Sequence, residues 1–327
     1  MTESHLTEPG KQAAANLPGG GFARLRDPDR SARQLRAALP YLGVALLLLA
    51  AVTFYPILYG IWMAFYNISL ATLSNNEFVG FENFKRLLGN PKSEFYPILG
   101  RTVIWTAMNV AAHVVIGTGL ALLLQKPGVR FRSFFKALLI LPWAVPSYIT
   151  VLAWKSLIFD YDYGYANAAL KALHIAPVSW LLDPTRAFWS TVLVNVWLGV
   201  PFMLMVASGA LQSIGRELYE SAELDGATTA QQIRHIALPM IRPIMTPAIV
   251  LGTIWTFNNF NAVYLLTGGG PYGSTDLVIT YVYRVAFGSG TNYQYSLAAA
   301  LSLVVFVMLL GLVWLYLRSV REVVSND

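Results

Sequence analysis

The side chains best suited to ligand chemistry lie on two polar faces inside long apolar segments. Each face consists of four residues spaced i, i+3, i+4 and i+7, which places them on one side of a helix. The two faces are Asn195, Leu198, Gly199 and Phe202 in "VNVWLGVPFML", and Gly252, Trp255, Thr256 and Asn259 in "LGTIWTFNNFNAVY". Amides and aromatic rings without charge suit a neutral, hydroxyl-rich ligand such as a sugar. The alternative interpretation is Asn-mediated packing between helices, with the two glycines allowing close approach.

The composition places these faces in a membrane. The 327 residues are 56% hydrophobic and only 12% charged, whereas about 25% of a soluble domain is charged. Segments of roughly 20 uncharged residues, long enough to cross a bilayer, recur along the chain. They predict an all-α polytopic membrane protein with six transmembrane helices, at about 39–64, 102–124, 137–158, 187–211, 240–264 and 296–317. The net charge of +6 is therefore no sign of nucleic-acid binding.

The distribution of Lys and Arg predicts the orientation of these spans. Basic residues concentrate in the segments that share a side with the N-terminus, most clearly in "QKPGVRFRSFFK" after the second span, and such segments are usually cytoplasmic. We expect both termini in the cytoplasm of a prokaryotic cell, on a multi-pass protein of the inner membrane. Residues 1–36 are expected to form a disordered cytoplasmic tail rather than a signal peptide, followed by a membrane domain over 37–322 and a short tail over 323–327.

The sequence contains no convincing catalytic, metal or cofactor site. It has no Cys and only four His, which show no metal-ligand spacing. "TGGGP" at 267–271 lacks the Lys of a phosphate-binding loop and is expected to be a turn. His113, inside the second span, is interpreted as a packed polar residue rather than a proton relay. We expect neither catalytic residues nor a cofactor, and no nucleic-acid partner.

The segment over 213–239 is unusually polar for a loop between two spans. Ser213 is a candidate cap for a first helix through "GRELYESAEL", and Gly226 is a natural stop after Asp225. Thr228 and Gln231 form a capping-box pattern that starts a second helix. The predicted structure is a helical elbow on the cytoplasmic side. It either packs against the protein's own spans or docks on a partner.

The elbow resembles the EAA signature of permease subunits of binding-protein-dependent ABC importers. That signature consists of Glu-Ala-Ala, three residues, Gly, nine residues, Ile, one residue and Leu-Pro. The corresponding residues are Glu220, Ser221, Ala222, Gly226, Ile236, Leu238 and Pro239. Asp225 lies directly before Gly226 in the turn. Every interval matches, and only Ser221 departs, as a small-for-small change. The resemblance implies the fold of a type I ABC importer permease. It also implies that the elbow inserts into a groove of a cytoplasmic ATPase.

A second resemblance narrows the family. "NVWLGVPF", "FNNF", "LLTGGGP" and "TDLVITYVYRVAF" are similar to the larger permease subunit of maltose/maltodextrin importers, over roughly residues 40–320. The resemblance implies that the two polar faces contact the sugar. Asn195, Leu198, Gly199 and Asn259 match that family's residue types. Phe202, Gly252, Trp255 and Thr256 depart from them, which leaves open a longer maltodextrin or another disaccharide.

The resemblance also implies a set of partners. They are a second permease subunit, two copies of an ATPase, an extracytoplasmic sugar-binding protein, the sugar itself and membrane lipid. Because the outer loops are short, the binding protein is expected on surfaces such as 67–101 and 265–295. Alternatives are an ion-driven secondary transporter, which would need carboxylates within its spans, and a permease for an anionic solute such as glycerol phosphate. A membrane enzyme fits the residues least.

Overall fold

The computed structural model describes residues 28–73, 76–126, 128–288 and 293–324. The chain divides into two units, residues 1–59 and 60–327, and each is described by itself. Within the first unit, the described residues form the N-terminal part of helix α1 (Pro28–Met63). Residues 28–36 are thus helical, although they were expected in the tail, and residues 1–27 and 325–327 lie outside the described part.

The second unit is almost entirely helical. After the end of α1 come a short antiparallel pair, β1 (Tyr66–Asn67) and β2 (Glu77–Phe78), and a 3-10 turn η2 (Leu70–Thr72). The helices that follow are α2 (Glu82–Leu88), α3 (Phe95–Gln125), α4 (Arg132–Ala144), α5 (Ser147–Ala153), α6 (Tyr165–Ala172), α7 (Pro184–Gln212), α8 (Arg216–Leu224), α9 (Thr229–Gln232), α10 (Leu238–Phe257), α11 (Phe260–Thr267), α12 (Val278–Phe287) and α13 (Tyr295–Val324), with π-helical turns η3 (Trp154–Ile158) and η4 (Ile233–Ala237).

The structure agrees with the prediction of six apolar spans if the third, which bends sharply, is counted as one span. Five helical segments among the described residues are long and apolar enough to cross a membrane, and a sixth arises if α4 and the helix over Ser147–Ile158 form one span bent by 95°. The bend falls at Val145, which is extended (φ −91°, ψ 136°), and Pro146. A residue before proline is disfavoured in the α conformation, because the proline ring clashes with it.

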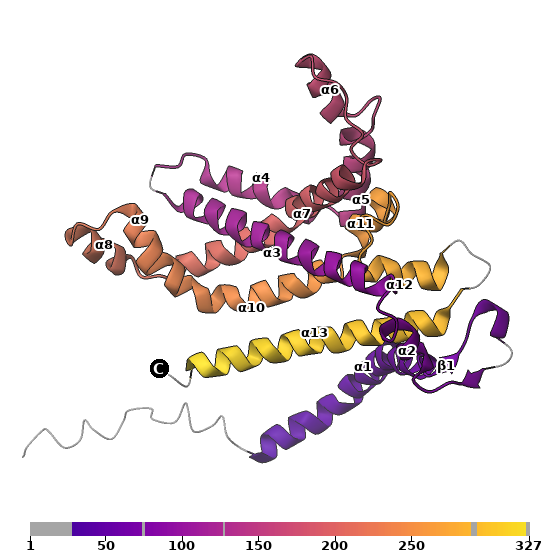
Figure 1. Ribbon diagram of the computed structural model, residues 1–327. Helices are drawn as coiled ribbons and strands as arrows, with labels where there is room; N and C mark the ends of the chain where they lie inside the picture. The colour runs from indigo at the N-terminus through magenta and orange to yellow at the C-terminus, as the bar shows by residue number, and fades with distance from the viewer. Residues whose placement is uncertain (1–27, 74–75, 127, 289–292, 325–327) are drawn as a thin grey trace, which may run out of the picture. The chain divides into compact units, whose positions relative to one another are not determined.

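The centre of the second unit is the packing of α3 along α7, with α10 against both (Figure 1). One core cluster of this packing joins Ala121 of α3 to Met203 and Leu204 of α7 and to Met245 of α10. The helices α8 and α9 lie at one end of this bundle, and α12 lies at the other, against α13 (Figure 1). Long-range packing of these helices brings the two predicted polar faces into one region.

Close approach of α3 and α7 depends on a glycine. A Cβ built on Gly117 would lie 2.7 Å from Cβ of Met203 and 2.9 Å from the backbone nitrogen of Leu204. Gly119, two residues further along the same helix, has nothing within 4 Å of its Cβ position. Small residues commonly permit such contacts between membrane helices.

We expect Gly117→Ala to lower the stability of the helix bundle by about 1–3 kcal/mol, because the new methyl group forces α3 and α7 apart. Gly119→Ala is the matched control, and we expect it to be neutral or stabilising by up to about 1 kcal/mol through helix propensity. The apparent melting temperature of each purified variant in detergent measures the difference. Equal melting temperatures for the two variants would contradict the packing of α3 on α7.

Candidate functional site

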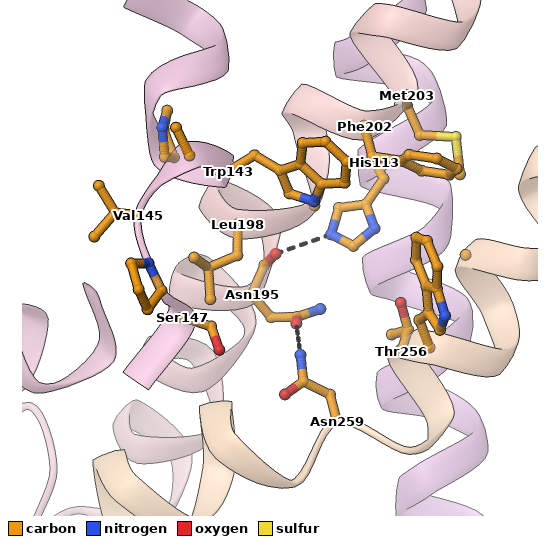
Figure 2. Close-up of a pocket in the computed structure, with 16 residues that line it drawn as sticks. His113, Trp143, Val145, Ser147, Asn195, Leu198, Phe202, Met203, Thr256 and Asn259 are labelled. Carbon is orange, nitrogen blue, oxygen red and sulfur yellow. Dashed lines mark hydrogen bonds between the residues drawn. The ribbon is translucent and has the colours of Figure 1, made fainter. Parts of the chain in front are cut away.

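A cavity of about 430 Å³ opens between α3, α7, α10 and the bend that joins α4 to α5. All eight residues of the two predicted polar faces line it: Asn195, Leu198, Gly199, Phe202, Gly252, Trp255, Thr256 and Asn259. Several of the other lining residues are drawn beside them in Figure 2. The structure thus brings both sets of residues to one cavity. Asn195, Leu198, Gly199 and Phe202 lie on one helix as predicted, whereas Asn259 lies beyond the end of α10 at Phe257 and not on one helical face with Gly252, Trp255 and Thr256. Their role in binding a substrate stays a prediction.

The two asparagines bond to each other in the wall of the cavity. Nδ2 of Asn259 donates to Oδ1 of Asn195 over 2.6 Å (Figure 2). Oδ1 of Asn259 in turn accepts from the backbone nitrogen of Ala262 over 3.1 Å, and so caps α11. Because α10 ends at Phe257 and α11 begins at Phe260, this cap also positions the amide of Asn259. The bond joins α7 to the break in the fifth span.

Aromatic rings form one wall of the cavity. The ring centroids of Phe202 and Trp255 lie 5.2 Å apart, and those of Trp143 and Phe202 lie 6.3 Å apart. Trp255 and Trp143 are half-exposed, at 50% and 51%, so their faces remain accessible. Among the described residues that line the cavity, none is Asp, Glu, Lys or Arg. The wall can contact the apolar face of a ring-shaped ligand, and the amides can bond to its polar edge.

The two glycines of the predicted faces have packing reasons for their size. A Cβ on Gly199 would collide with the imidazole of His113, and one on Gly252 would lie 2.8 Å from Cε of Met203. The sequence left close packing between helices as the alternative role of these glycines, and that packing is present. Both glycines also line the cavity, so the same residues take part in packing and in forming the cavity.

Eight further lining residues were not predicted. They are His113 of α3, Met203 of α7 and the segment Pro142, Trp143, Ala144, Val145, Pro146 and Ser147. The segment has no polar periodicity, and only its two prolines signalled a break. His113 was expected as a packed polar residue, and it is indeed buried (4% exposed) with Nε2 3.0 Å from the backbone oxygen of Asn195. Its position beside the cavity could not be read from spacing, because no other lining residue comes from α3.

The elbow over 213–239 has the predicted form with one correction. Thr228 and Gln231 form the capping box at the start of α9, and Gly226, with φ +77°, follows the C-cap Asp225 of α8. The expectation that Ser213 caps the first helix is wrong. Ser213 instead ends α7, where its hydroxyl donates to the carbonyl oxygen of Ala210, and Gly215 precedes α8.

One side of α8 packs on the bundle and the rest is open. Tyr219 packs against the core cluster around Leu211 and Ala237, and burial raises the pKa of its hydroxyl. By contrast, Leu218 and Leu224 are 46% and 90% exposed. The residues predicted to contact a partner all lie in this elbow: Glu220, Ser221, Ala222, Asp225, Gly226, Ile236, Leu238 and Pro239. Their contact with a partner stays a prediction.

A charged cluster holds the glycine-rich turn after α11. Arg284 of α12 pairs with Asp276 (3.0 Å) and with Glu94 (2.9 Å), and Nη1 of Arg101 donates to the backbone oxygen of Gly273 over 2.6 Å. Burial raises the pKa of the Asp276 carboxyl, against the opposing effect of Arg284. Tyr272 at the tip of this turn is 98% exposed. The segment "TGGGP" is thus a turn, as expected.

Comparison with known proteins decides the family. Residues 114–323 match the family described as "Binding-protein-dependent transport system inner membrane component". The chain belongs to this family. The matched range contains α7, α10 and the elbow. It also contains every residue of the two polar faces.

Curated relatives in the family extend the likeness to most of the chain. The galactooligosaccharide transport system permease GanP of Bacillus subtilis (strain 168) is 34% identical over 86% of this chain and 70% of its own length. The maltodextrin transport system permease MdxF of the same strain is 32% identical over 84% of this chain and 67% of its own length. MalF of Escherichia coli (strain K12) is 36% identical over 74% of this chain. The chain spans about half of MalF, since 49% of that protein is covered.

Solved structures support the fold. A bacterial ABC transporter involved in the import of the acidic polysaccharide alginate matches with a TM-score of 0.76 and 23% identity, over 90% of this chain and 99% of the other. The methionine ABC transporter MetNI, in an inward-facing conformation, matches with a TM-score of 0.52 and 16% identity, over 74% of this chain and 98% of the other. The predicted all-α fold of type I ABC importer permeases is confirmed.

Proposed function

We propose that this chain is a membrane permease subunit of an ATP-driven sugar importer and that the cavity lined by Asn195 and Asn259 is its sugar-binding site. The observation that carries the proposal is the amide pair itself, set in an uncharged cavity with aromatic walls. Its volume of about 430 Å³ falls in the range of small-molecule sites, roughly 300–1,000 Å³. The relatives GanP, MdxF and MalF are named as transport permeases for oligosaccharides or maltose.

The proposed substrate is maltose, a maltodextrin or a related neutral oligosaccharide. The alginate importer handles an acidic polysaccharide, and an acidic sugar would favour Arg or Lys in the cavity. The described lining residues include neither, so the cavity favours a neutral sugar. The aromatic pair Phe202 and Trp255 supplies a stacking surface for one sugar ring, as aromatic side chains with polar edges nearby commonly do.

The proposed mechanism is alternating access around this cavity. A loaded binding protein and ATP drive the spans outward-facing, and the sugar occupies the site beside Asn195 and Asn259. Hydrolysis and opening of the ATPase dimer, transmitted through Glu220–Pro239, return the cavity to the cytoplasm. A second permease subunit completes the path. The ATPase activity belongs to the partner, and this chain acts as a transport subunit rather than as an enzyme.

The elbow is proposed as the ATPase contact because its exposed surface is apolar as well as charged. Leu224 is 90% exposed at the end of α8, beside the Arg216–Glu220 ion pair. An exposed leucine beside charged groups on a short helix is what a partner groove can bury. Gly226 has no atom within 4 Å of its Cβ position, which leaves space for a partner to approach.

The binding protein is proposed to contact the turn that carries Tyr272. The two outer surfaces predicted for this contact, 67–101 and 265–295, meet at the Glu94–Arg284 pair. Residues 74–75 and 289–292 of these surfaces lie outside the described part. The charged cluster around Asp276 holds the turn in place, and a fixed, fully exposed tyrosine is a common anchor in protein interfaces.

We expect Asn259→Leu to reduce sugar import by at least about tenfold, because it removes a polar contact from the cavity and leaves Oδ1 of Asn195 without its donor. Loss of the α11 cap adds a stability cost of about 1 kcal/mol, so import is normalised to the amount of assembled complex. Uptake of radiolabelled maltose and maltotriose into proteoliposomes measures the effect. Asn258→Leu is the matched control, since Asn258 does not line the cavity. Unchanged import kinetics in Asn259→Leu would show that the cavity is wrongly assigned.

We expect Gly226→Arg to abolish association with the ATPase, because a long charged side chain fills the space left at the elbow. Gly128→Arg is the matched control. Gly128 also has positive φ (+89°) and nothing within 4 Å of its Cβ position, and it lies in the basic loop outside the elbow. Tagged chains are purified from native membranes, and ATP hydrolysis of what co-purifies is assayed with and without maltose-loaded binding protein.

The ATPase is expected with the native chain and with Gly128→Arg, and absent from Gly226→Arg. Stimulation of hydrolysis by the loaded binding protein would support the sugar assignment. A native chain that purifies from well-preserved membranes without any ATPase would remove the importer proposal, and an ion-driven transporter would then be the hypothesis to pursue.

We expect Tyr272→Ala to raise the binding-protein concentration needed for half-maximal ATPase stimulation by roughly fivefold or more, the loss typical of an interface anchor. Tyr272→Phe keeps the ring and is expected to change this concentration much less. Titration of the reconstituted complex with loaded binding protein measures both. Identical titration curves for Tyr272→Ala and the native chain would place the contact elsewhere.

A further inference from the structure

The hydrogen bonds around the cavity fix the orientation of the Asn195 amide. Oδ1 of Asn259 must be the acceptor toward the N–H of Ala262, since a backbone nitrogen only donates. Nδ2 of Asn259 therefore faces Asn195, and Asn195 must present Oδ1 to it. The remaining amide nitrogen of Asn195 is buried and has no hydrogen-bond partner among the described residues. It points to the side of the cavity on which Thr256 lies (Figure 2).

The hydrogen of the His113 ring is assigned in the same way. Nε2 of His113 lies 3.0 Å from the backbone oxygen of Asn195, and a carbonyl oxygen only accepts. Nε2 therefore carries the hydrogen, and in the neutral imidazole Nδ1 is then an acceptor. No hydrogen bond to Nδ1 is found among the described residues. Since His113 lines the cavity, Nδ1 is an acceptor without a partner beside it.

Gly199 holds this ring in place. The imidazole of His113 lies so close to Gly199 that any Cβ there would collide with it. The ring is thus fixed on one side by the helix α7 and at Nε2 by the hydrogen bond to Asn195. A ring held in this way presents Nδ1 in one direction, which is what selective recognition of a ligand atom requires.

We propose that His113 is a substrate-binding residue, and that Nδ1 of His113 and Nδ2 of Asn195 together bind one hydroxyl group of the sugar. A hydroxyl donates one hydrogen bond and accepts others, so it satisfies the unpartnered acceptor and the unpartnered donor at once. The inference rests on the proposed sugar-import function and adds to it a residue from α3. It also defines the polarity of one subsite: the hydroxyl donates to His113 and accepts from Asn195.

The test uses sugar analogues that lack one hydroxyl at a time. The complete importer with its own ATPase and binding protein is reconstituted into proteoliposomes. Import of maltose is compared with import of its monodeoxy and monodeoxyfluoro derivatives, for the native chain and for His113→Phe. Fluorine cannot donate, so a hydroxyl that donates to Nδ1 is not replaced by it. For each analogue, the ratio of maltose import to analogue import is measured. Because the same binding protein serves both chains, its own preferences cancel when the ratio for the native chain is divided by the ratio for His113→Phe.

We expect the native chain to import one deoxy and its matching fluoro derivative roughly tenfold or more slowly than maltose, the effect of one unmet buried hydrogen bond. In His113→Phe the ratio for the fluoro derivative at that position should fall to about one, because the contact to which the hydroxyl donates is gone. The ratio for the deoxy derivative should fall only in part, since that sugar still lacks the contact with Nδ2 of Asn195, and the ratios for other positions should stay as they are. Asn109→Leu is the control on the same helix. Asn109 is a fully buried polar residue one turn away that does not line the cavity, and its analogue ratios should equal those of the native chain.

If His113→Phe does not assemble, His113→Leu replaces it. Leucine is smaller than phenylalanine and has neither a donor nor an acceptor, so the same fall of the fluoro ratio is expected. Analogue ratios that are identical in the native chain and in the His113 variants would overturn the inference and leave His113 as a packing residue. A native importer that transports neither maltose nor maltotriose would instead count against the proposed function.

Discussion

The need of buried amide groups for hydrogen-bond partners organises the central part of this protein. Asn195 lies in the middle of an apolar helix that is long enough to cross a membrane, where no water satisfies polar groups. Its side chain bonds to Asn259 over 2.6 Å, and Asn259 in turn caps α11. This short chain of bonds ties α7 to the break in the fifth span. The contact therefore fixes where both amides lie in the wall of the cavity.

Two interruptions of helical structure give the cavity its shape. The bend at Val145 and Pro146 turns α5 away from α4 by 95°, so that the segment between them faces the cavity instead of continuing a straight span. The break between Phe257 and Phe260 does the same for the fifth span. At both places the backbone polar groups freed from the helix lie in protein or beside a cavity, which is the condition for irregular backbone at membrane depth.

Local patterns predicted much of this arrangement, and long-range contacts account for what they missed. The helical spacing of Asn195 and Phe202 depends only on the geometry of a single helix and therefore survived in the structure. The spacing of Gly252, Trp255 and Thr256 survived for the same reason, whereas Asn259 lies in the break after α10 and reaches the cavity from there. The capping box of Thr228 is equally local. Ser213 was assigned to the wrong helix, because a serine can end one helix or begin the next and only the path of the backbone decides.

His113 shows most clearly why the rest could not be read from the sequence. A single histidine in an apolar helix has no periodic partner, and its closeness to Gly199 arises from packing between α3 and α7. The segment Pro142–Ser147 faces the cavity because of a bend whose angle no composition encodes. The eight predicted residues thus describe two walls of the cavity, and the other walls follow from tertiary structure.

The central claim is that sugar occupies the cavity lined by Asn195, Asn259 and Trp255. The most direct measurement is a structure of the complete importer trapped with sugar-loaded binding protein and a non-hydrolysable ATP analogue, in the presence of maltotriose. The account predicts sugar density in this cavity, with a ring against Trp255 and hydroxyl groups within hydrogen-bond distance of the two asparagines. Sugar bound elsewhere along the path, with this cavity filled by side chains, would contradict it.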